Sequence, residues 1–304
     1  MRFTILIAAF RAGPYIFQAL QSVRSQSYED WEVIVVEDGS QDETQAIVEA
    51  FSASVPQPVR YERFAANQGV SRTRNRLLQL ASSPLLAFLD ADDWWEPGHL
   101  QFLAAVFVKG ADVSVSRTQL YDLSARCATG TVIPPNQLAT DPVQALFEES
   151  CIITSSSVAF RSELAGRVGW FDPELQIGED RDFWMRCALA GGRFAESGAV
   201  TCIYARHAAN TMSKTLLWAQ QEVAFYEKYR VLKRISGKER RSRLAHTLMN
   251  LGRLLRASDP VASTMALWRA WKLAPWDTIL IPHLVFSAGS AALRVVAPVT
   301  RTPL

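Results

Sequence analysis

Apolar, strand-like segments alternate with amphipathic, helix-like segments over the first 93 residues. The strand-like segments are residues 3–10, 31–40, 59–64 and 84–93, and the helix-like segments are 15–26, 40–51 and 69–82. Ser40 and Glu43 have the spacing of a capping box, which predicts a helix start there. Regular alternation of this kind predicts an α/β fold with a mostly parallel, Rossmann-like central sheet and helices on both faces.

Acidic residues follow two of these predicted strands. Asp38 ends the second strand, and Asp90, Asp92 and Asp93 end the fourth in the stretch FLDADDWWEP. In a doubly wound sheet, ligands bind outside the carboxyl ends of the strands, so we expect these aspartates to line one crevice. Paired carboxylates suit Mg²⁺ or Mn²⁺, which take one or two of them together with substrate phosphates. The alternative is a capped turn that starts a helix at Trp94.

Arg74 lies on the apolar side of its predicted helix. Arg72 and Arg76 share one face, while Arg74 points about 200° away, toward Val70 and Leu77. An unpaired charge is costly on an apolar face. Arg74 is therefore expected to have a fixed anionic partner, either an internal aspartate or the pocket of a bound nucleotide.

The stretch IGEDRDFW gathers three acidic side chains at one predicted helix start. The helix dipole favours negative charge at a helix start. This alternative explains all three acidic residues without a catalytic role. This explanation suits Asp182 best, because Arg186 lies one turn further on. Glu179 and Asp180 follow Gly178, and a carboxylate held there can act as a general base. His207 lies in a polar stretch, where a structural or exposed histidine is the alternative to a contact with ligand phosphate or metal.

Net charge, cysteine spacing and the apolar C-terminal stretch bear on the partners and the cellular location of the protein. The chain of 304 residues has a net charge of +2, which gives no overall case for nucleic-acid binding. Its four cysteines show no metal-binding spacing, so we expect a reducing cytoplasm. Pro282, His283 and Arg294 interrupt the apolar stretch 278–299, which is expected to lie on the inner face of the membrane as a peripheral helical tail rather than to span it.

The order of the motifs resembles that of the family-2 glycosyltransferases, which have the GT-A fold. The likeness spans residues 3–213 and rests on QSVRSQSYEDWEVIVVEDGSQDET, NQGVSRTRN, FLDADDWWEP, GWFDPELQIGEDRDFWMR and RHAANTMS, in that order. It implies a catalytic domain over residues 1–212. The amphipathic segments that follow are expected to form a C-terminal helical region, 213–304, that contacts a membrane or a partner.

The resemblance implies an inverting, metal-dependent transfer, of hexosyltransferase type, from a nucleotide-diphosphate sugar to an acceptor hydroxyl. A UDP-sugar is the favoured donor, and the acceptor is a glycan, a lipid-linked saccharide or a small molecule in polysaccharide or glycoconjugate biosynthesis. The residues carried over are Asp180 as catalytic base with Glu179 beside it, Asp92 and Asp90 for Mn²⁺ or Mg²⁺, and Ala9, Phe10, Arg11, Asp38, Arg74, Asp90 and His207 for the donor.

The first loop departs from the family pattern. Ala8–Arg11 stands where the family has a Pro-Thr-Tyr-Asn-like stretch, so Ala9 lacks a hydroxyl that would contact the base. Phe10 can still stack on the base, and Arg11 offers a phosphate contact. Three other classes of protein are alternatives: a phosphohydrolase, a nucleotidyltransferase and a non-catalytic binding or scaffold module. The first needs a hydroxyl residue after Asp92 and the second a Gly-rich loop near the N-terminus, and neither is present.

Overall fold

The computed structural model describes residues 1–148, 153–207 and 215–275. The chain forms two compact units, residues 1–210 and residues 211–304. The predicted boundary after residue 212 and the predicted tail 278–299 both lie outside the described residues.

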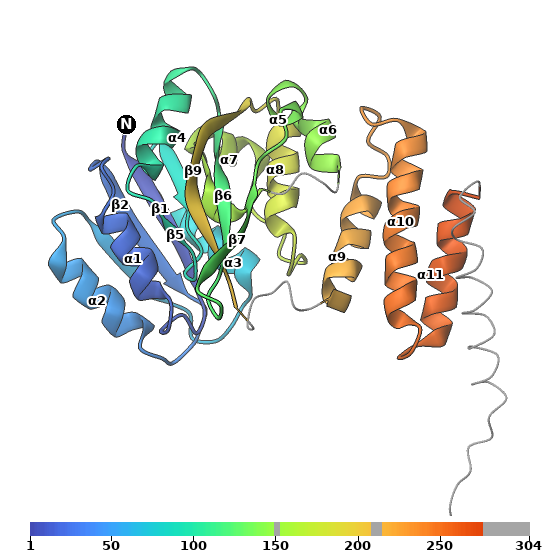
Figure 1. Cartoon of the computed structure of the whole chain (residues 1–304), viewed down its shortest axis with the longest axis horizontal. Helices are drawn as coiled ribbons and strands as arrows, with labels where there is room; N and C mark the ends of the chain where they lie inside the picture. The colour runs from blue at the N-terminus through green and yellow to red at the C-terminus, as the bar shows by residue number, and fades with distance from the viewer. Residues whose placement is uncertain (149–152, 208–214, 276–304) are drawn as a thin grey trace, which may run out of the picture. The chain divides into compact units, whose positions relative to one another are not determined.

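The first half of the sheet is parallel, as predicted. Four strands lie in the order β3, β2, β1, β4, and all three pairings are parallel (Figure 1). Their bounds are β1 Phe3–Ala9, β2 Trp31–Glu37, β3 Val59–Arg63 and β4 Leu85–Phe88, and the helices between them are α1 Ile16–Arg24, α2 Thr44–Ser54 and α3 Val70–Leu80. Because the strands are parallel, their carboxyl ends meet at one edge of the sheet.

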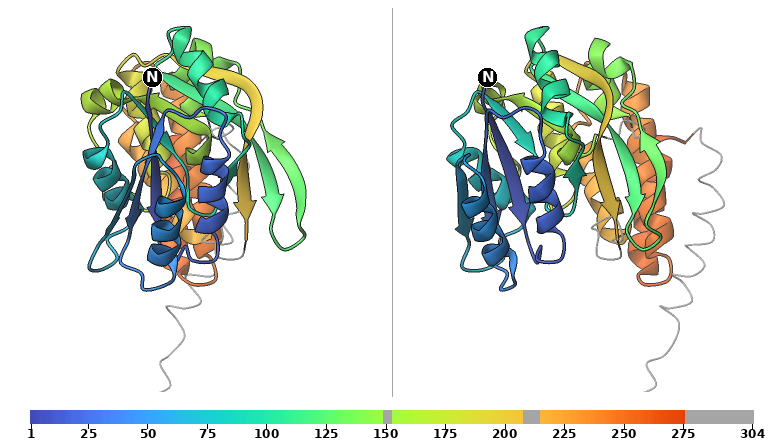
Figure 2. Two further views of the ribbon diagram at one scale, coloured as in Figure 1. Left: turned by 90° about the vertical axis from the view of Figure 1, so that its left-hand side faces the viewer. Right: turned by 60° about the vertical axis from the view of Figure 1, so that its left-hand side comes forward.

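Helices cover both faces of this sheet (Figures 1 and 2). Alternate residues of β1, among them Phe3, Ile5 and Ile7, join a core with residues of α1, α2 and α4. The opposite face packs against α3 and α8, where Phe88 of β4 contacts Trp184 edge to face. The strands are buried on both faces, which explains why they read as nearly continuous apolar runs.

The second half of the sheet mixes both directions. The order continues from β4 through β8, β6 and β9 to β5, with β7 paired to β6. Only the pairing of β6 with β9 is parallel, while β4–β8, β6–β8, β6–β7 and β5–β9 are antiparallel. The bounds are β5 Trp94–Trp95, α4 His99–Val108, β6 Val113–Asp122, β7 Cys127–Val132, α5 Gln137–Thr140, α6 Pro142–Phe147, β8 Val158–Arg161, α7 Ser162–Val168, α8 Glu179–Leu189 and β9 Phe194–Arg206.

One local prediction was wrong. Helix α2 begins at Thr44 and has no capping box, because the Ser40 hydroxyl is bonded to Glu37 and to the backbone of Arg11 instead. The alternative of a helix that starts at Trp94 is ruled out, because Trp94 pairs with β9. Ser155–Ser157 form a 3-10 helix before β8.

The described part of the second unit, residues 215–275, is helical, as predicted. It contains α9 Thr215–Lys228, α10 Gly237–Leu255 and α11 Pro260–Leu273. Helix α11 begins with an Asp259 cap and Pro260. It packs closely on α10, since a Cβ at Gly252 would lie 2.7 Å from Cγ of Leu267. Within the described residues, every helix is too short or too polar to cross a membrane.

Candidate active site

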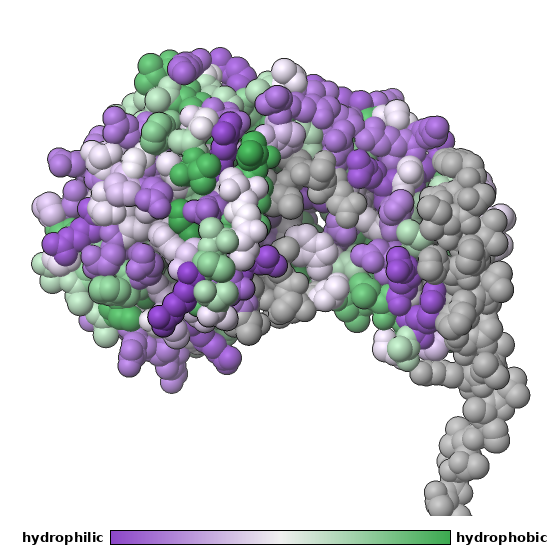
Figure 3. All heavy atoms as spheres, viewed as in Figure 1, coloured by the Kyte–Doolittle hydropathy of each residue, from purple (hydrophilic) through white to green (hydrophobic). Residues whose placement is uncertain are grey.

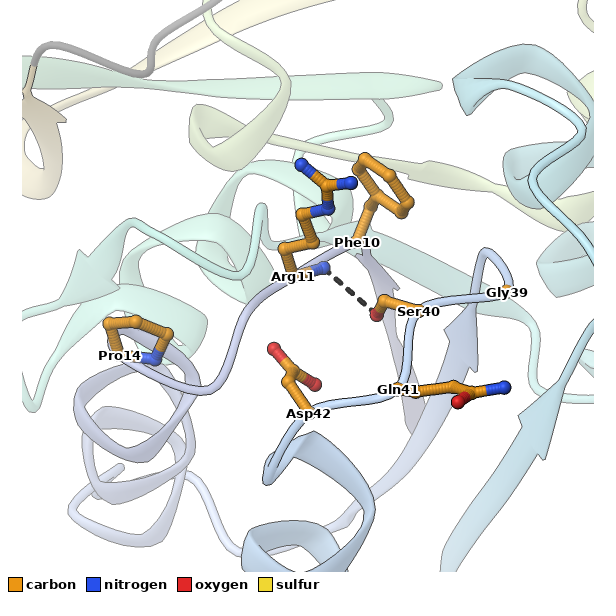
Figure 4. Close-up of a pocket in the computed structure, with 7 residues that line it drawn as sticks. All are labelled: Phe10, Arg11, Pro14, Gly39, Ser40, Gln41 and Asp42. Carbon is orange, nitrogen blue, oxygen red and sulfur yellow. Dashed lines mark hydrogen bonds between the residues drawn. The ribbon is translucent and has the colours of Figure 1, made fainter.

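A pocket opens where β1 and β2 end. It is lined by Phe10, Arg11, Pro14, Gly39, Ser40, Gln41 and Asp42 (Figure 4). Its volume of about 500 Å³ lies within the range of about 300–1,000 Å³ that is usual for small-molecule sites. The phenyl ring of Phe10 is 47% exposed, and the Arg11 guanidinium carbon lies 5.1 Å from its centroid. A planar ring and a cation are therefore presented at the rim.

A buried carboxylate, Glu37, holds this rim through hydrogen bonds that the sequence did not indicate. Arg11 has the unusual φ of 52° for a residue with a side chain, and its N–H donates to the Ser40 hydroxyl over 3.0 Å (Figure 4). Ser40 and Tyr61 both donate to Glu37, which is 1% exposed. Glu37 thus fixes Ser40, and Ser40 fixes the backbone of Arg11.

Asp38 joins the end of β2 to the loop before α3. Its carboxylate accepts hydrogen bonds from the N–H groups of Gln68 (2.6 Å) and Gly69 (2.9 Å) and from the Asn67 amide (2.9 Å). Its own N–H donates to the carbonyl of Ala9, whose side chain is only 2% exposed. Asp38 and Ala9 are therefore buried beside the pocket and are not among the residues that line it.

The aspartates after β4 take different environments. Asp90 and Asp92 are partly exposed, with 32% and 30% of their side chains accessible. His207 at the end of β9 contacts Asp92 over 2.9 Å and stacks on Tyr15, with ring centroids 4.5 Å apart. Burial and the charge of Asp90 raise the pKa of Asp92, and the bond to His207 opposes that shift. His207 therefore joins the first loop to the aspartate predicted to bind a metal.

Asp93 is structural, a role that the sequence did not indicate. Its carboxylate accepts from the Ser156 hydroxyl (2.6 Å) and from the N–H of Ala205 (2.9 Å), and it is 1% exposed. The Ser156 oxygen also accepts from the N–H of Asp90 over 3.0 Å. Asp93 thereby ties the turn after β4 to β9 and to the 3-10 helix.

Arg74 links the aspartate cluster to the start of α8. Its side chain is 5% exposed and forms ion pairs with Asp90, over 2.9 Å, and with Glu179. Burial disfavours the charged guanidinium, but the two carboxylates raise its pKa. Burial raises the pKa of Glu179 to about 7, and Arg74 opposes that shift. The prediction that Arg74 has a fixed anionic partner is confirmed, and the structure shows two such partners, Asp90 and Glu179.

Glu179 and Asp180 are neighbours with different surroundings. Glu179 faces Arg74 and is 6% exposed, whereas Asp180 is partly exposed. Asp180 accepts hydrogen bonds from the Ser155 hydroxyl (3.0 Å) and from the N–H of Arg181 (2.7 Å). The predicted pair of Asp182 with Arg186 is present at 2.9 Å. Asp182 is therefore part of the helix rather than of the site.

Helix α3 also fastens the loop that leads to these carboxylates. The Asn75 amide accepts from the N–H of Phe171 (2.7 Å) and donates to its carbonyl (2.9 Å). The Ser71 hydroxyl donates to the carbonyl of Leu175 over 2.6 Å. Gly178 then adopts a φ of 75° at the helix start. The face of α3 that carries Arg74 thus holds residues 171–179 at three points.

The donor atoms suit a hard divalent cation that is shared with a ligand. Among the described residues, no group of three or more His, Cys, Asp and Glu side chains converges on one point. Asp90 and Asp92 supply two partly exposed carboxylates, which matches Mg²⁺ or Mn²⁺ completed by phosphate oxygens. A zinc centre closed by protein ligands would need more groups than these.

Comparison with known proteins identifies the family to which the sequence is similar. Residues 4–163 match the family described as Glycosyl transferase family 2. An uncharacterized glycosyltransferase of Nostoc sp. is 27% identical over 57% of this chain and 55% of its own. Succinoglycan biosynthesis protein ExoO of Rhizobium meliloti is 30% identical over 66% of this chain and 60% of its own. The match therefore spans little more than half the length of these two relatives.

Solved structures share the fold. S. aureus TarS 1-349 in complex with UDP-GlcNAc has a TM-score of 0.68 at 18% identity, covering 95% of this chain and 89% of that one. The mannosyltransferase PcManGT of Pyrobaculum calidifontis, in complex with GDP-Man and Mn²⁺, has a TM-score of 0.58 at 21% identity, covering 97% and 81%. The fold is therefore GT-A, and the chain belongs to glycosyl transferase family 2.

Proposed function

We propose that this protein transfers a sugar from a nucleotide-diphosphate sugar to an acceptor hydroxyl, with inversion at the anomeric carbon. One observation carries the proposal: Arg74 pairs with both Asp90 and Glu179. These two ion pairs support a site in which the carboxylates suited to a metal–diphosphate lie near Asp180, the sequence neighbour of Glu179 and the carboxylate suited to activating an acceptor. A binding module would need the first group but has no use for the second.

The nucleoside end of the donor would occupy the pocket at the ends of β1 and β2. The exposed Phe10 ring offers a stacking surface for the base, and Arg11 adds a positive charge beside it. Asp38 would contact the base next to this pocket, and the bonds from the N–H groups of residues 68–69 hold its carboxylate in one orientation. A UDP-sugar is the donor we favour, in line with the UDP-GlcNAc complex of TarS.

Asp92 and Asp90 would hold Mn²⁺ or Mg²⁺ with the diphosphate. When bound, the cation neutralises the negative charge that gathers on the leaving nucleoside diphosphate. His207 lies against Asp92 and would turn a ring N–H toward the phosphate oxygens. The Mn²⁺ complex of PcManGT supports this choice of cation.

Asp180 would accept the proton of the acceptor hydroxyl as that oxygen attacks the anomeric carbon. The hydrogen bonds from Ser155 and Arg181 hold its carboxylate in one orientation without burying it. Glu179 is enclosed with Arg74, so we assign it a positioning role beside the base. The name of the relative ExoO supports polysaccharide biosynthesis as the setting. We propose a glycan or a lipid-linked saccharide as the acceptor.

The test compares variants of two acidic residues near the start of α8. Each is incubated with Mn²⁺, a panel of nucleotide sugars and glycan or lipid-linked acceptors. Release of nucleoside diphosphate and binding of the donor are measured. Asp180→Asn should lose about 10²–10⁴-fold in turnover and keep donor affinity. Glu174→Gln, an exposed carboxylate of the preceding loop, should retain both. Full turnover in Asp180→Asn would show that Asp180 is not the catalytic base. Donor binding without turnover in the parent protein would favour the scaffold alternative.

A further inference from the structure

The helical unit, residues 215–275, carries a net charge of opposite sign to residues 1–207, which we call the catalytic unit after the function proposed above. Residues 215–275 contain twelve Lys and Arg against four Asp and Glu, whereas residues 1–207 contain 17 against 25. The near-neutral total therefore hides a strongly basic unit. Hydrophilic residues cover much of its visible face in Figure 3. Such a unit is attracted to anionic surfaces, and the acidic catalytic unit is repelled by them.

Helix α11 is apolar on two sides. One side, with Ala266, Leu267 and Ala270, is buried on α10. The other presents Val261, Met265 and Trp268, whose side chains are 54%, 62% and 44% exposed. These three positions recur at helical spacing, so they form one stripe along the helix. Packing against α10 explains why the first side is apolar. It does not explain the exposed apolar residues of the second side.

The end of this stripe combines aromatic rings with a cation. Trp268 stacks on Trp271 with centroids 5.0 Å apart, and the ammonium of Lys272 lies 5.2 Å from the centroid of Trp268. Tryptophan rings beside a lysine whose stem covers apolar surface are typical of the boundary between lipid headgroups and acyl chains. The exposed Lys233, Lys238 and Arg253 lie on the same unit.

We infer that the stripe formed by Val261, Met265, Trp268 and Lys272 is a docking face for anionic lipid, on which α11 lies parallel to the membrane surface. Net positive charge draws the unit to anionic headgroups, and the stripe enters the boundary below them. An acidic protein would satisfy the charge but gives no reason for an aliphatic and tryptophan stripe backed by a lysine. The inference does not depend on sugar transfer, because lipid binding is measured without donor or acceptor.

The test uses the full chain and extruded vesicles of phosphatidylcholine, alone or with about one third phosphatidylglycerol. Sedimentation should show binding to the anionic vesicles, weaker binding at high salt and little binding to phosphatidylcholine alone. The double variant Met265→Ser/Trp268→Ser should lose at least about tenfold in partitioning. Phe102→Ser/Val108→Ser, on α4 of the catalytic unit, is the matched control because those side chains are 46% and 77% exposed. Thermal unfolding verifies that both double variants are folded.

Three outcomes would overturn the inference. The first is no binding to anionic vesicles at low salt. The second is unchanged binding by Met265→Ser/Trp268→Ser, together with loss of binding when residues 276–304 are deleted, which would assign the contact to that segment. The third is binding to soluble polyglutamate but not to vesicles, which would make the face a site for an acidic protein.

Discussion

Arg74 and Glu179 lie 105 positions apart in the sequence and form a buried ion pair at the centre of the catalytic unit. Arg74 also pairs with Asp90, so one guanidinium fixes the distance between the end of β4 and the start of α8. The two halves of the candidate site are therefore joined by a single side chain.

Removing that side chain should destabilise the catalytic unit. Arg74→Ala would leave Glu179 and Asp90 without their cation, and breaking a buried pair from one side costs about 3–5 kcal/mol. Urea unfolding followed by tryptophan fluorescence measures the change. Arg76→Ala is the control on the same helix, because Arg76 forms a partly exposed pair with Glu62. Equal losses in the free energy of unfolding would show that the buried pairs of Arg74 stabilise the protein no more than the partly exposed pair of Arg76.

Asn75 should matter for turnover more than for donor binding. Its amide holds both backbone groups of Phe171, in the loop that leads to Asp180. We expect Asn75→Ala to lower kcat about tenfold by loosening the base, while the donor dissociation constant stays nearly unchanged. Steady-state kinetics and calorimetric titration with the nucleoside diphosphate separate the two effects. Arg72→Ala, an exposed neighbour on α3, should alter neither. A loss confined to donor affinity would contradict the assignment.

The close approach at Gly39 gives a steric test of the pocket. A Cβ there would lie 2.4 Å from the backbone carbon of Ala66, at a φ of 73°. Gly39→Ala should therefore cost about 2 kcal/mol or more and weaken nucleotide binding, because it separates the loops that Asp38 joins. In Gly166→Ala, on helix α7, the new methyl meets nothing within 4 Å and stability should rise by about 0.5–1 kcal/mol. Thermal unfolding of Gly39→Ala, with and without nucleotide, measures both effects. Unchanged stability and an unchanged shift with nucleotide would contradict the close approach at Gly39.

His99 should make the catalytic unit sensitive to acid. Burial lowers its pKa from 6.5 to about 3, and its Nδ1 lies 2.9 Å from the Thr201 hydroxyl. Below pH 6.5 the unfolded chain takes up a proton that the folded chain does not, so stability falls as the pH drops toward 3. At about pH 5 the loss is roughly 2 kcal/mol.

The matching experiment measures urea unfolding of His99→Asn at about pH 7 and about pH 5. Asparagine can keep the bond to Thr201 and carries no titrating group, so the difference between the two pH values should shrink by roughly 2 kcal/mol. His246→Asn, an exposed histidine on α10, should leave the difference unchanged. A pH dependence that is the same in His99→Asn would mean that His99 does not titrate as its burial requires.

The sequence predicted those parts of the molecule that local pattern controls. The parallel strands and their helices follow from alternating apolar segments, and the position of Arg74 on an apolar face required a buried partner. The sequence could not predict that Glu179 is the partner of Arg74. Glu179 reaches Arg74 because Asn75 and Ser71 bind the loop that precedes it. The role of Asp93 was missed for the same reason, because Ser156 and Ala205 lie 63 and 112 positions away. The antiparallel pairings of the second half likewise depend on distant contacts.

The measurement that tests the central claim most directly is a thermal-shift panel. UDP, GDP, dTDP and CMP are each added with Mn²⁺ or with chelator to the parent protein and to Asp92→Ala. A ligand at about 100 times its dissociation constant stabilises the folded state by roughly 2.7 kcal/mol, which such a panel detects. We predict a metal-dependent shift with UDP that Asp92→Ala abolishes. The absence of a shift with every nucleotide would contradict the account.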